Sequence, residues 1–175
     1  MQKKIRLLVL SLTLILSAFI IFSHVADARR RGEYARSSAS APDFIAEDVY
    51  GNKTRLSELW NRKPVLLVFL ATWCGYCTRE LPGLKAFADE HQERIKVVAV
   101  DSGESKRTVM NYIRRRKIDF LTLLDEDREI WRRYRVRATP THFLIDGDGK
   151  IIARRIGFAF KKDLEAMLSM VERED

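Results

Sequence analysis

Two cysteines separated by two residues are the part of this sequence whose chemistry is easiest to state. Cys74 and Cys77 are the only cysteines in the chain. Their spacing suits a dithiol that cycles with a disulfide, because one thiolate attacks a target disulfide and the second thiol resolves the mixed disulfide. A structural zinc site needs about four ligands, and a disulfide over so short a loop would constrain the unfolded chain little. The pattern therefore favours redox chemistry, and no metal or cofactor is expected.

The residues around the cysteines predict the elements that position them. The apolar run 65–71 is typical of a strand buried on both faces. In the segment 78–90 the apolar residues recur at intervals of three and four, which indicates a helix. Cys74 is expected at the start of this helix, where free N–H groups and the helix dipole lower a thiol pKa from about 8.5. Cys74 is thus the predicted exposed nucleophile and Cys77 the shielded resolving thiol.

The rest of the chain predicts alternating helices and strands. A hairpin is expected over Phe44–Leu56, turning at Gly51–Asn52, and Ser57 is expected to cap a short helix that ends at Trp60. The other expected strands are 95–100, 120–124, 141–145 and 150–156, and the other expected helices are 105–117, 127–134 and 161–171. This order predicts an α/β fold.

The chain resembles a known family through two separate motifs. These are Trp73-Cys74-Gly75-Tyr76-Cys77 and Ala138-Thr139-Pro140-Thr141. Together they are similar to the thioredoxin superfamily, and most similar to its ResA/TlpA group of membrane-anchored, extracytoplasmic thiol-disulfide oxidoreductases. The similarity runs from about Ala41 to the C-terminus. It implies a thioredoxin-like sandwich with an N-terminal hairpin and a central α-β insertion, preceded by an N-terminal membrane helix.

The resemblance also implies which residues bind the substrate. It places a cis Thr139–Pro140 bond beside the cysteines, with the Thr139 backbone free to pair with an extended substrate. Trp73 is expected to shield the thiolate, and Gly75 and Tyr76 to set its local polarity. Many relatives have proline where this chain has Tyr76, and a Gly-Tyr pair also occurs in disulfide isomerases of the DsbC type, so the redox potential is open.

A further expected residue is a proton acceptor for the second thiol. Cytoplasmic thioredoxins carry a buried aspartate six residues before the first cysteine, where this chain has Val68. Glu80 lies one helical turn after Cys77, and ResA-like proteins have a glutamate there that is taken as the acceptor. The alternative is a glutamate that only complements the helix N-terminus. His142 is expected to be a packing or rim residue, and neither His24 nor His91 is expected to join a side-chain constellation.

The N-terminal segment predicts export. Residues 7–22 are almost entirely apolar, and we expect residues 1–28 to be an uncleaved anchor, with a signal peptide cleaved after Ala26-Asp27-Ala28 as the alternative. Residues 29–41 are the expected tether and 42–175 the expected thioredoxin-like domain. Either alternative exports the domain, and the anchor predicts a single-pass protein of the cytoplasmic (inner) membrane with its domain on the extracytoplasmic, periplasmic side.

Charge does not indicate nucleic-acid binding. The net charge is +8, but residues 1–42 hold seven basic and two acidic side chains and so carry five of these charges. The basic cluster Arg114–Lys117 is expected to be a solvated helix end, with a docking patch as the alternative.

The resemblance implies a function for this dithiol. It would reduce a disulfide in apocytochrome c or in a copper-site protein, as a monomer, with electrons from a membrane donor of the CcdA/DsbD kind. One alternative is a disulfide oxidant or isomerase. Another is a redox-inactive module that docks partners in its thioredoxin-like groove, and a peroxiredoxin is a weaker option.

Overall fold

The computed structural model describes residues 35–36 and 39–171. The expected membrane segment and most of the expected tether lie outside these residues. Within the described residues, no helix is both long and apolar enough to span a bilayer.

A mixed six-stranded sheet forms the centre of the domain, in the order β1-β8-β7-β4-β5-β6. Strand β4 is parallel to β5, and β5 is parallel to β6, whereas β7 is antiparallel to both β4 and β8. The strands are β1 (Ala35–Arg36), β4 (Val65–Leu70), β5 (Lys96–Asp101), β6 (Leu121–Leu123), β7 (Thr141–Ile145) and β8 (Ile151–Ile156).

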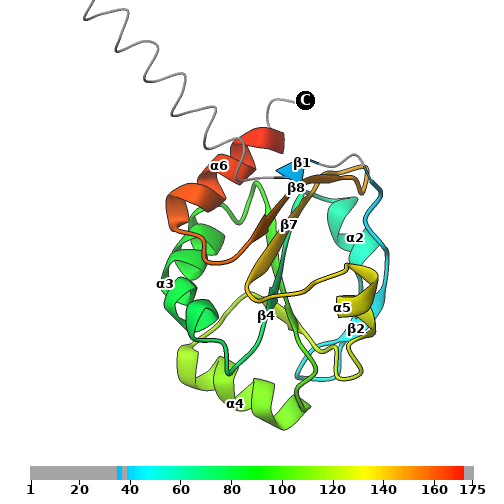
Figure 1. Ribbon diagram of the computed structural model, residues 1–175. Coiled ribbons are helices and arrows are strands. Elements are labelled where there is room, and N and C mark those ends of the chain that lie inside the picture. Colours follow the sequence, from blue (N-terminus) through cyan, green and yellow to red (C-terminus); the bar gives the residue numbers. More distant parts are fainter. Residues whose placement is uncertain (1–34, 37–38, 172–175) are drawn as a thin grey trace, which may run out of the picture. The chain divides into compact units, whose positions relative to one another are not determined.

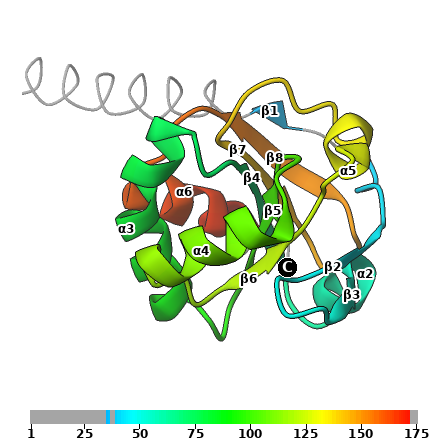
Figure 2. The same cartoon turned by 90° about the horizontal axis from the view of Figure 1, so that it is seen from below.

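Helices cover both faces of this sheet (Figures 1 and 2). Helices α3, α4 and α6 lie on one face, and α2 and α5 lie on the other together with a small hairpin. The helices are α2 (Leu56–Trp60), α3 (Gly75–Glu90), α4 (Lys106–Arg116), α5 (Glu129–Arg133) and α6 (Lys161–Val171). The predicted order of helices and strands is confirmed except for β1, which lies in the expected tether and was not predicted. Helix α5 is shorter than the expected helix.

Strand β4 is buried along its whole length, as its unbroken apolar sequence predicts. Its alternate side chains Val65, Leu67 and Phe69 belong to the core on the α2 and α5 side. Leu70 points to the other face and clusters with the two cysteines. The strand that leads to the redox motif is therefore held from both sides.

The predicted N-terminal hairpin is confirmed as β2 (Ile45–Glu47) and β3 (Lys53–Arg55), which pair antiparallel. Its turn is closed by the Asp48 carboxylate, which accepts hydrogen bonds from the backbone N–H groups of Tyr50 and Asn52 at 2.7 and 2.9 Å. The hairpin also reaches the sheet, because the Leu124 N–H donates to the Glu47 carbonyl at 2.8 Å. Asp48 forms an isolated antiparallel bridge with Leu123 of β6.

The start of α2 differs from the prediction. Its N-cap is Arg55, which makes no side-chain capping bond, and Ser57 lies inside the helix. Asp43 supplies the missing acceptor, because its carboxylate accepts from the Ser57 N–H at 2.9 Å and from the Ser57 hydroxyl at 3.0 Å. The expected cap by Ser57 is therefore wrong, since a residue fourteen positions earlier caps the helix through tertiary structure. The predicted cap of α4 by Ser105 is confirmed.

Candidate active site

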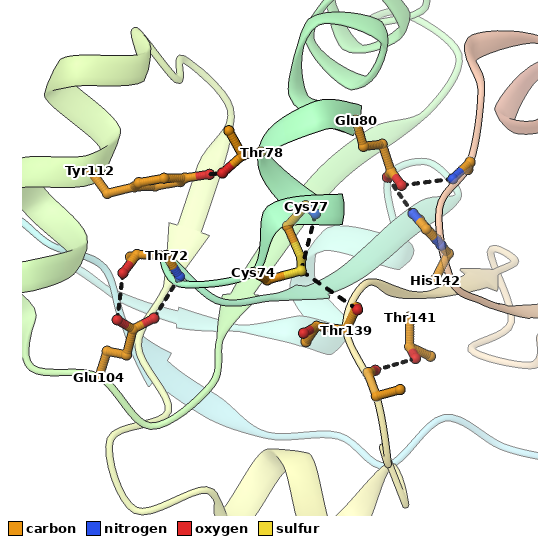
Figure 3. The surroundings of a disulfide bond; sticks show 12 residues. Thr72, Cys74, Cys77, Thr78, Glu80, Glu104, Tyr112, Thr139, Thr141 and His142 are labelled. Carbon is orange, nitrogen blue, oxygen red and sulfur yellow. Dashed lines mark hydrogen bonds and ion pairs between the residues drawn. A yellow bond between two sulfur atoms is a disulfide. The ribbon is translucent and has the colours of Figure 1, made fainter.

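The two cysteines form a disulfide at the start of α3 (Figure 3). Cys74 is the N-cap residue, and its Sγ accepts a hydrogen bond from the Cys77 N–H at 3.0 Å. This confirms the predicted position of Cys74, where a free N–H group and the helix dipole stabilise negative charge on sulfur. The same N–H would stabilise a Cys74 thiolate after reduction.

The two sulfurs differ little in exposure in this oxidised form. Cys74 is 6% exposed and Cys77 is 3% exposed, so the expected contrast between an exposed and a shielded thiol is small. The residues between and before them are open to solvent instead, with Trp73 67% and Tyr76 62% exposed. Trp73 is therefore not buried as a packing residue. A Cβ added at Gly75 would meet no atom within 4 Å, so that position is open as well.

The second motif lies against the disulfide. The Thr139–Pro140 bond is cis, as predicted, and the Thr139 carbonyl oxygen lies 3.6 Å from Cys74 Sγ. Neighbouring bonds fix this loop, because the Thr141 hydroxyl donates to the Ala138 carbonyl at 2.7 Å and the Gly157 N–H donates to the Pro140 carbonyl at 2.8 Å. Within the described part of the chain, no group accepts the Thr139 N–H. One donor and one acceptor of the Thr139 backbone are thus available beside the sulfur.

Glu80 is buried on α3, and its carboxyl group has two hydrogen-bond partners. Its Oε1 lies 2.5 Å from His142 Nε2, and its Oε2 accepts from the Ala159 N–H at 2.8 Å (Figure 3). His142 lies on β7 and is completely buried. The expectation that His142 is a packing or rim residue is therefore incomplete, because the ring is bonded to the predicted proton acceptor. Only the fold brings these two positions together, since they lie 62 residues apart.

Two acidic residues that were not predicted as site residues, Glu104 and Asp101, also lie near the cysteines. Glu104 accepts from both the N–H and the hydroxyl of Thr72 at 2.6 Å, and so fixes the segment just before Cys74. The Glu104 N–H donates to the buried Asp101 carboxyl at the end of β5 at 2.9 Å. Burial raises the pKa of Asp101 to about 7, and the nearby charge of Glu104 adds to this effect. The signal available in the sequence was an aspartate at the end of an apolar strand.

Of the two histidines that were expected to join no constellation, His24 lies outside the described residues and His91 lies within them. His91 does join a constellation, because ligand atoms of Glu90, His91 and Glu165 lie within 4.8 Å of one another. The Lys161 ammonium, however, pairs with both of these carboxylates, at 3.7 Å for Glu165. This cation already balances the acidic charge. The basic cluster Arg114–Lys117 is exposed at the end of α4, as expected of a solvated helix end.

The chemistry of the site follows from its two sulfurs. They pass two electrons when the Cys74–Cys77 bond breaks and a bond in another molecule forms, or the reverse. The Thr139 backbone can hold an extended chain against Cys74 while this happens. The fold and this site together define the class of thioredoxin-like thiol-disulfide oxidoreductases.

Known proteins support this class. A family model described as AhpC/TSA matches residues 38–154. Thiol-disulfide oxidoreductase ResA of Bacillus thuringiensis (strain Al Hakam) is 32% identical over 172 residues, which are 97% of this chain and 99% of that protein. ResA of Bacillus subtilis (strain 168) is 34% identical over 154 residues, 87% of this chain and 86% of that protein.

The solved structures agree with the sequences. The crystal structure of a protein assigned as thiol:disulfide interchange protein DsbE from Chlorobium tepidum superposes with a TM-score of 0.71 at 28% identity, and covers 78% of this chain and 98% of that one. The expected thioredoxin-like fold is thereby confirmed. The chain belongs to the AhpC/TSA family, and within it is a thiol-disulfide oxidoreductase of the ResA/DsbE type.

Proposed function

We propose that the protein is an extracytoplasmic disulfide reductase whose substrate is a disulfide within an extended polypeptide. The observation that carries this proposal is the Thr139 backbone, whose carbonyl oxygen lies 3.6 Å from Cys74 Sγ and whose N–H has no acceptor among the described residues. An extended chain can pair with these two groups and so present its disulfide to Cys74. Such a segment fits the haem-attachment motif of apocytochrome c, or a copper-site protein.

The reaction proceeds in two exchanges. The Cys74 thiolate attacks one substrate sulfur, so that a mixed disulfide forms, the substrate disulfide breaks and one substrate thiolate leaves and takes up a proton. Cys77 then gives its proton to Glu80 and attacks Cys74 Sγ. This forms the Cys74–Cys77 disulfide and releases the second substrate thiolate, which is protonated in turn. The substrate gains two electrons and two protons. The dithiol loses two electrons, the proton that Cys74 released when its thiolate formed, and the Cys77 proton that Glu80 then passes on.

Glu80 suits the role of proton acceptor in the second exchange. It lies three residues after Cys77 on α3, so both side chains leave the same side of the helix. Its burial keeps bulk water from taking this role. Val68 stands where cytoplasmic thioredoxins have their buried acid, and it is apolar.

A reductant in an oxidising compartment must be recharged from the cytoplasm. We propose that residues 1–28 anchor the domain in the cytoplasmic membrane beside a donor of the CcdA/DsbD kind, which raises the effective concentration of the two partners. The full-length protein is then expected to stay in the membrane fraction after a carbonate wash and to keep Met1. A mature N-terminus at Arg29 would contradict the anchor and identify a cleaved signal peptide.

The reduction potential of the Cys74/Cys77 couple tests the direction of electron flow. We expect a value nearer that of thioredoxin, about −270 mV, than that of DsbA, about −120 mV. Equilibration in glutathione or dithiothreitol buffers of known potential, followed by alkylation and mass spectrometry, gives this value. A potential above about −180 mV would contradict the reductase and favour an oxidant or isomerase. With a low potential, loss of Cys74 should deplete holo-cytochrome c, and external thiol should restore it.

A further inference from the structure

His142 is the buried titratable residue for which the proposed mechanism has no role so far. It lies two residues after Pro140 on β7, and its cross-strand partners are Val68 on β4 and Arg155 on β8. Residues directly opposite each other in neighbouring strands point to the same face of the sheet, so all three point to the face that α3 and α6 cover. The ring thus lies on the same side of the sheet as Glu80.

The hydrogen bonds of the ring determine which nitrogen carries its proton. His142 Nδ1 is buried and has no hydrogen-bond partner among the described groups. A proton on Nδ1 would be a buried donor without an acceptor, which is unfavourable. We therefore assign the proton of the neutral ring to Nε2, which then donates to Glu80 Oε1 at 2.5 Å.

This assignment makes Glu80 an acceptor on both oxygens. One carboxylate oxygen accepts from His142 and the other accepts from the Ala159 N–H. Both donors stabilise the ionised form of this carboxyl group. The lone pairs that remain can take up a proton from Cys77.

The other charges around the pair leave this arrangement intact. Arg155 of β8 is the nearest cation by strand register, and its guanidinium donates to the Phe158 carbonyl at 3.0 Å and pairs with Asp163 of α6 at 3.6 Å. On α3 itself the adjacent charged residue is Arg79, whose guanidinium carbon lies 5.9 Å from the centroid of the Phe158 ring. On β4, Val68 brings no charge opposite His142.

We propose that His142 is a positioning residue for the exchange reaction, which holds Glu80 ionised and fixes the direction of its carboxylate through the Nε2–H bond. His142 itself takes up no proton, because a proton on its second nitrogen would have no acceptor. This inference rests on the proposed role of Glu80 as proton acceptor, and it is independent of the physiological substrate and of the direction of electron flow.

The experiment uses the reduced protein and Ellman's reagent as the disulfide. Cys74 attacks first and releases one equivalent of thionitrobenzoate, and Cys77 then attacks the mixed disulfide and releases the second. The first release depends on reagent concentration and the second does not, so stopped-flow absorbance separates them. The second rate, measured as a function of pH, reports the proton transfer from Cys77.

We expect His142→Leu to slow the second release about tenfold at neutral pH and to move the midpoint of its pH profile upward, because Glu80 loses a donor to its charged form. The first release should not change. His142→Gln should behave like the wild type, since its amide N–H reaches a similar position without titrating. His91→Gln, a substitution of a histidine remote from the site, should also leave both releases unchanged.

Glu80→Gln separates the inference from the mechanism on which it rests. In that background His142→Leu should have no further effect on the pH profile. If Glu80→Gln slows the second release and His142→Leu does not, only the role of His142 is overturned. If Glu80→Gln itself leaves the second release unchanged, the proposed proton acceptor fails and the inference fails with it.

A measurement on the wild-type protein covers the case in which His142→Leu does not fold. Nitrogen-15 NMR of the histidine rings distinguishes the two neutral tautomers and the charged ring. We expect His142 to carry its proton on Nε2 and none on Nδ1 at neutral pH. A ring that carries a proton on Nδ1 at this pH would overturn the proposal.

Discussion

A Cys77→Ala variant is expected to accumulate a covalent adduct with its substrate through Cys74, close to one equivalent per protein. The reason is that Cys74 sits at the helix N-cap, where the N–H of residue 77 stabilises its thiolate, while the thiol that resolves the adduct is gone. Cys74→Ala, in contrast, is expected to lower exchange to the rate of the reaction without protein. Cys77 lies inside the first turn of α3 and not at its N-cap, so it cannot replace the lost nucleophile.

Mass spectrometry of the reduced variants after incubation with a disulfide peptide measures both effects. The two single variants control each other, because each keeps one thiol in the same fold. Alkylation of the reduced wild-type protein should label Cys74 first. An adduct that forms through Cys77 in the Cys74→Ala variant would contradict the assignment of the nucleophile.

The free energy of unfolding is expected to fall as the pH rises from about 4 to about 7. Asp101 has its pKa raised from 3.8 to about 7, mainly by burial, so in this range the folded protein keeps a proton that the unfolded chain has released. The stabilisation from Asp101 is complete below pH 3.8, the pKa in the unfolded chain, and is lost as the pH rises through about 7, the pKa in the folded protein. The upper limit is about 4 kcal/mol, because a tenfold change in proton affinity is worth about 1.4 kcal/mol.

Asp101→Asn imitates the protonated side chain and should remove this pH dependence. Denaturant unfolding of the oxidised protein at pH 5 and at pH 8 measures the free energy of unfolding. The difference between Asp101→Asn and the wild type should shift in favour of the variant at the higher pH. Asp119→Asn is the matched control, since Asp119 is exposed. Equal differences between Asp101→Asn and wild type at the two pH values would refute the role of Asp101.

Local pattern predicted most of the fold, because most of its elements are locally encoded. The strand around Phe69 is apolar without a break, the hairpin turns at Gly51, and Ser105 caps its own helix. The start of α2 was mispredicted, since its cap comes from Asp43 across fourteen residues. A search for local caps finds Ser57 there and has no access to the distant carboxylate.

The site divides in the same way. The position of Cys74 follows from the local sequence pattern, the cis bond before Pro140 was implied by the family resemblance, and the structure has both. The bond between Glu80 and His142 joins a helix to a strand, and no periodicity connects them. The same holds for Glu104, whose bonds to Thr72 cross from one loop to another.

The N-terminal hairpin has a consequence for how the protein coexists with unfolded chains. Strand β6 ends the sheet on one side, and an open edge of this kind exposes backbone groups that template aggregation. Here the hairpin covers it, through the bond from the Leu124 N–H to the Glu47 carbonyl and the bridge between Asp48 and Leu123. If the protein binds extended polypeptides at Thr139, as we propose, the covered edge keeps them, and copies of the protein itself, from forming intermolecular sheets along β6.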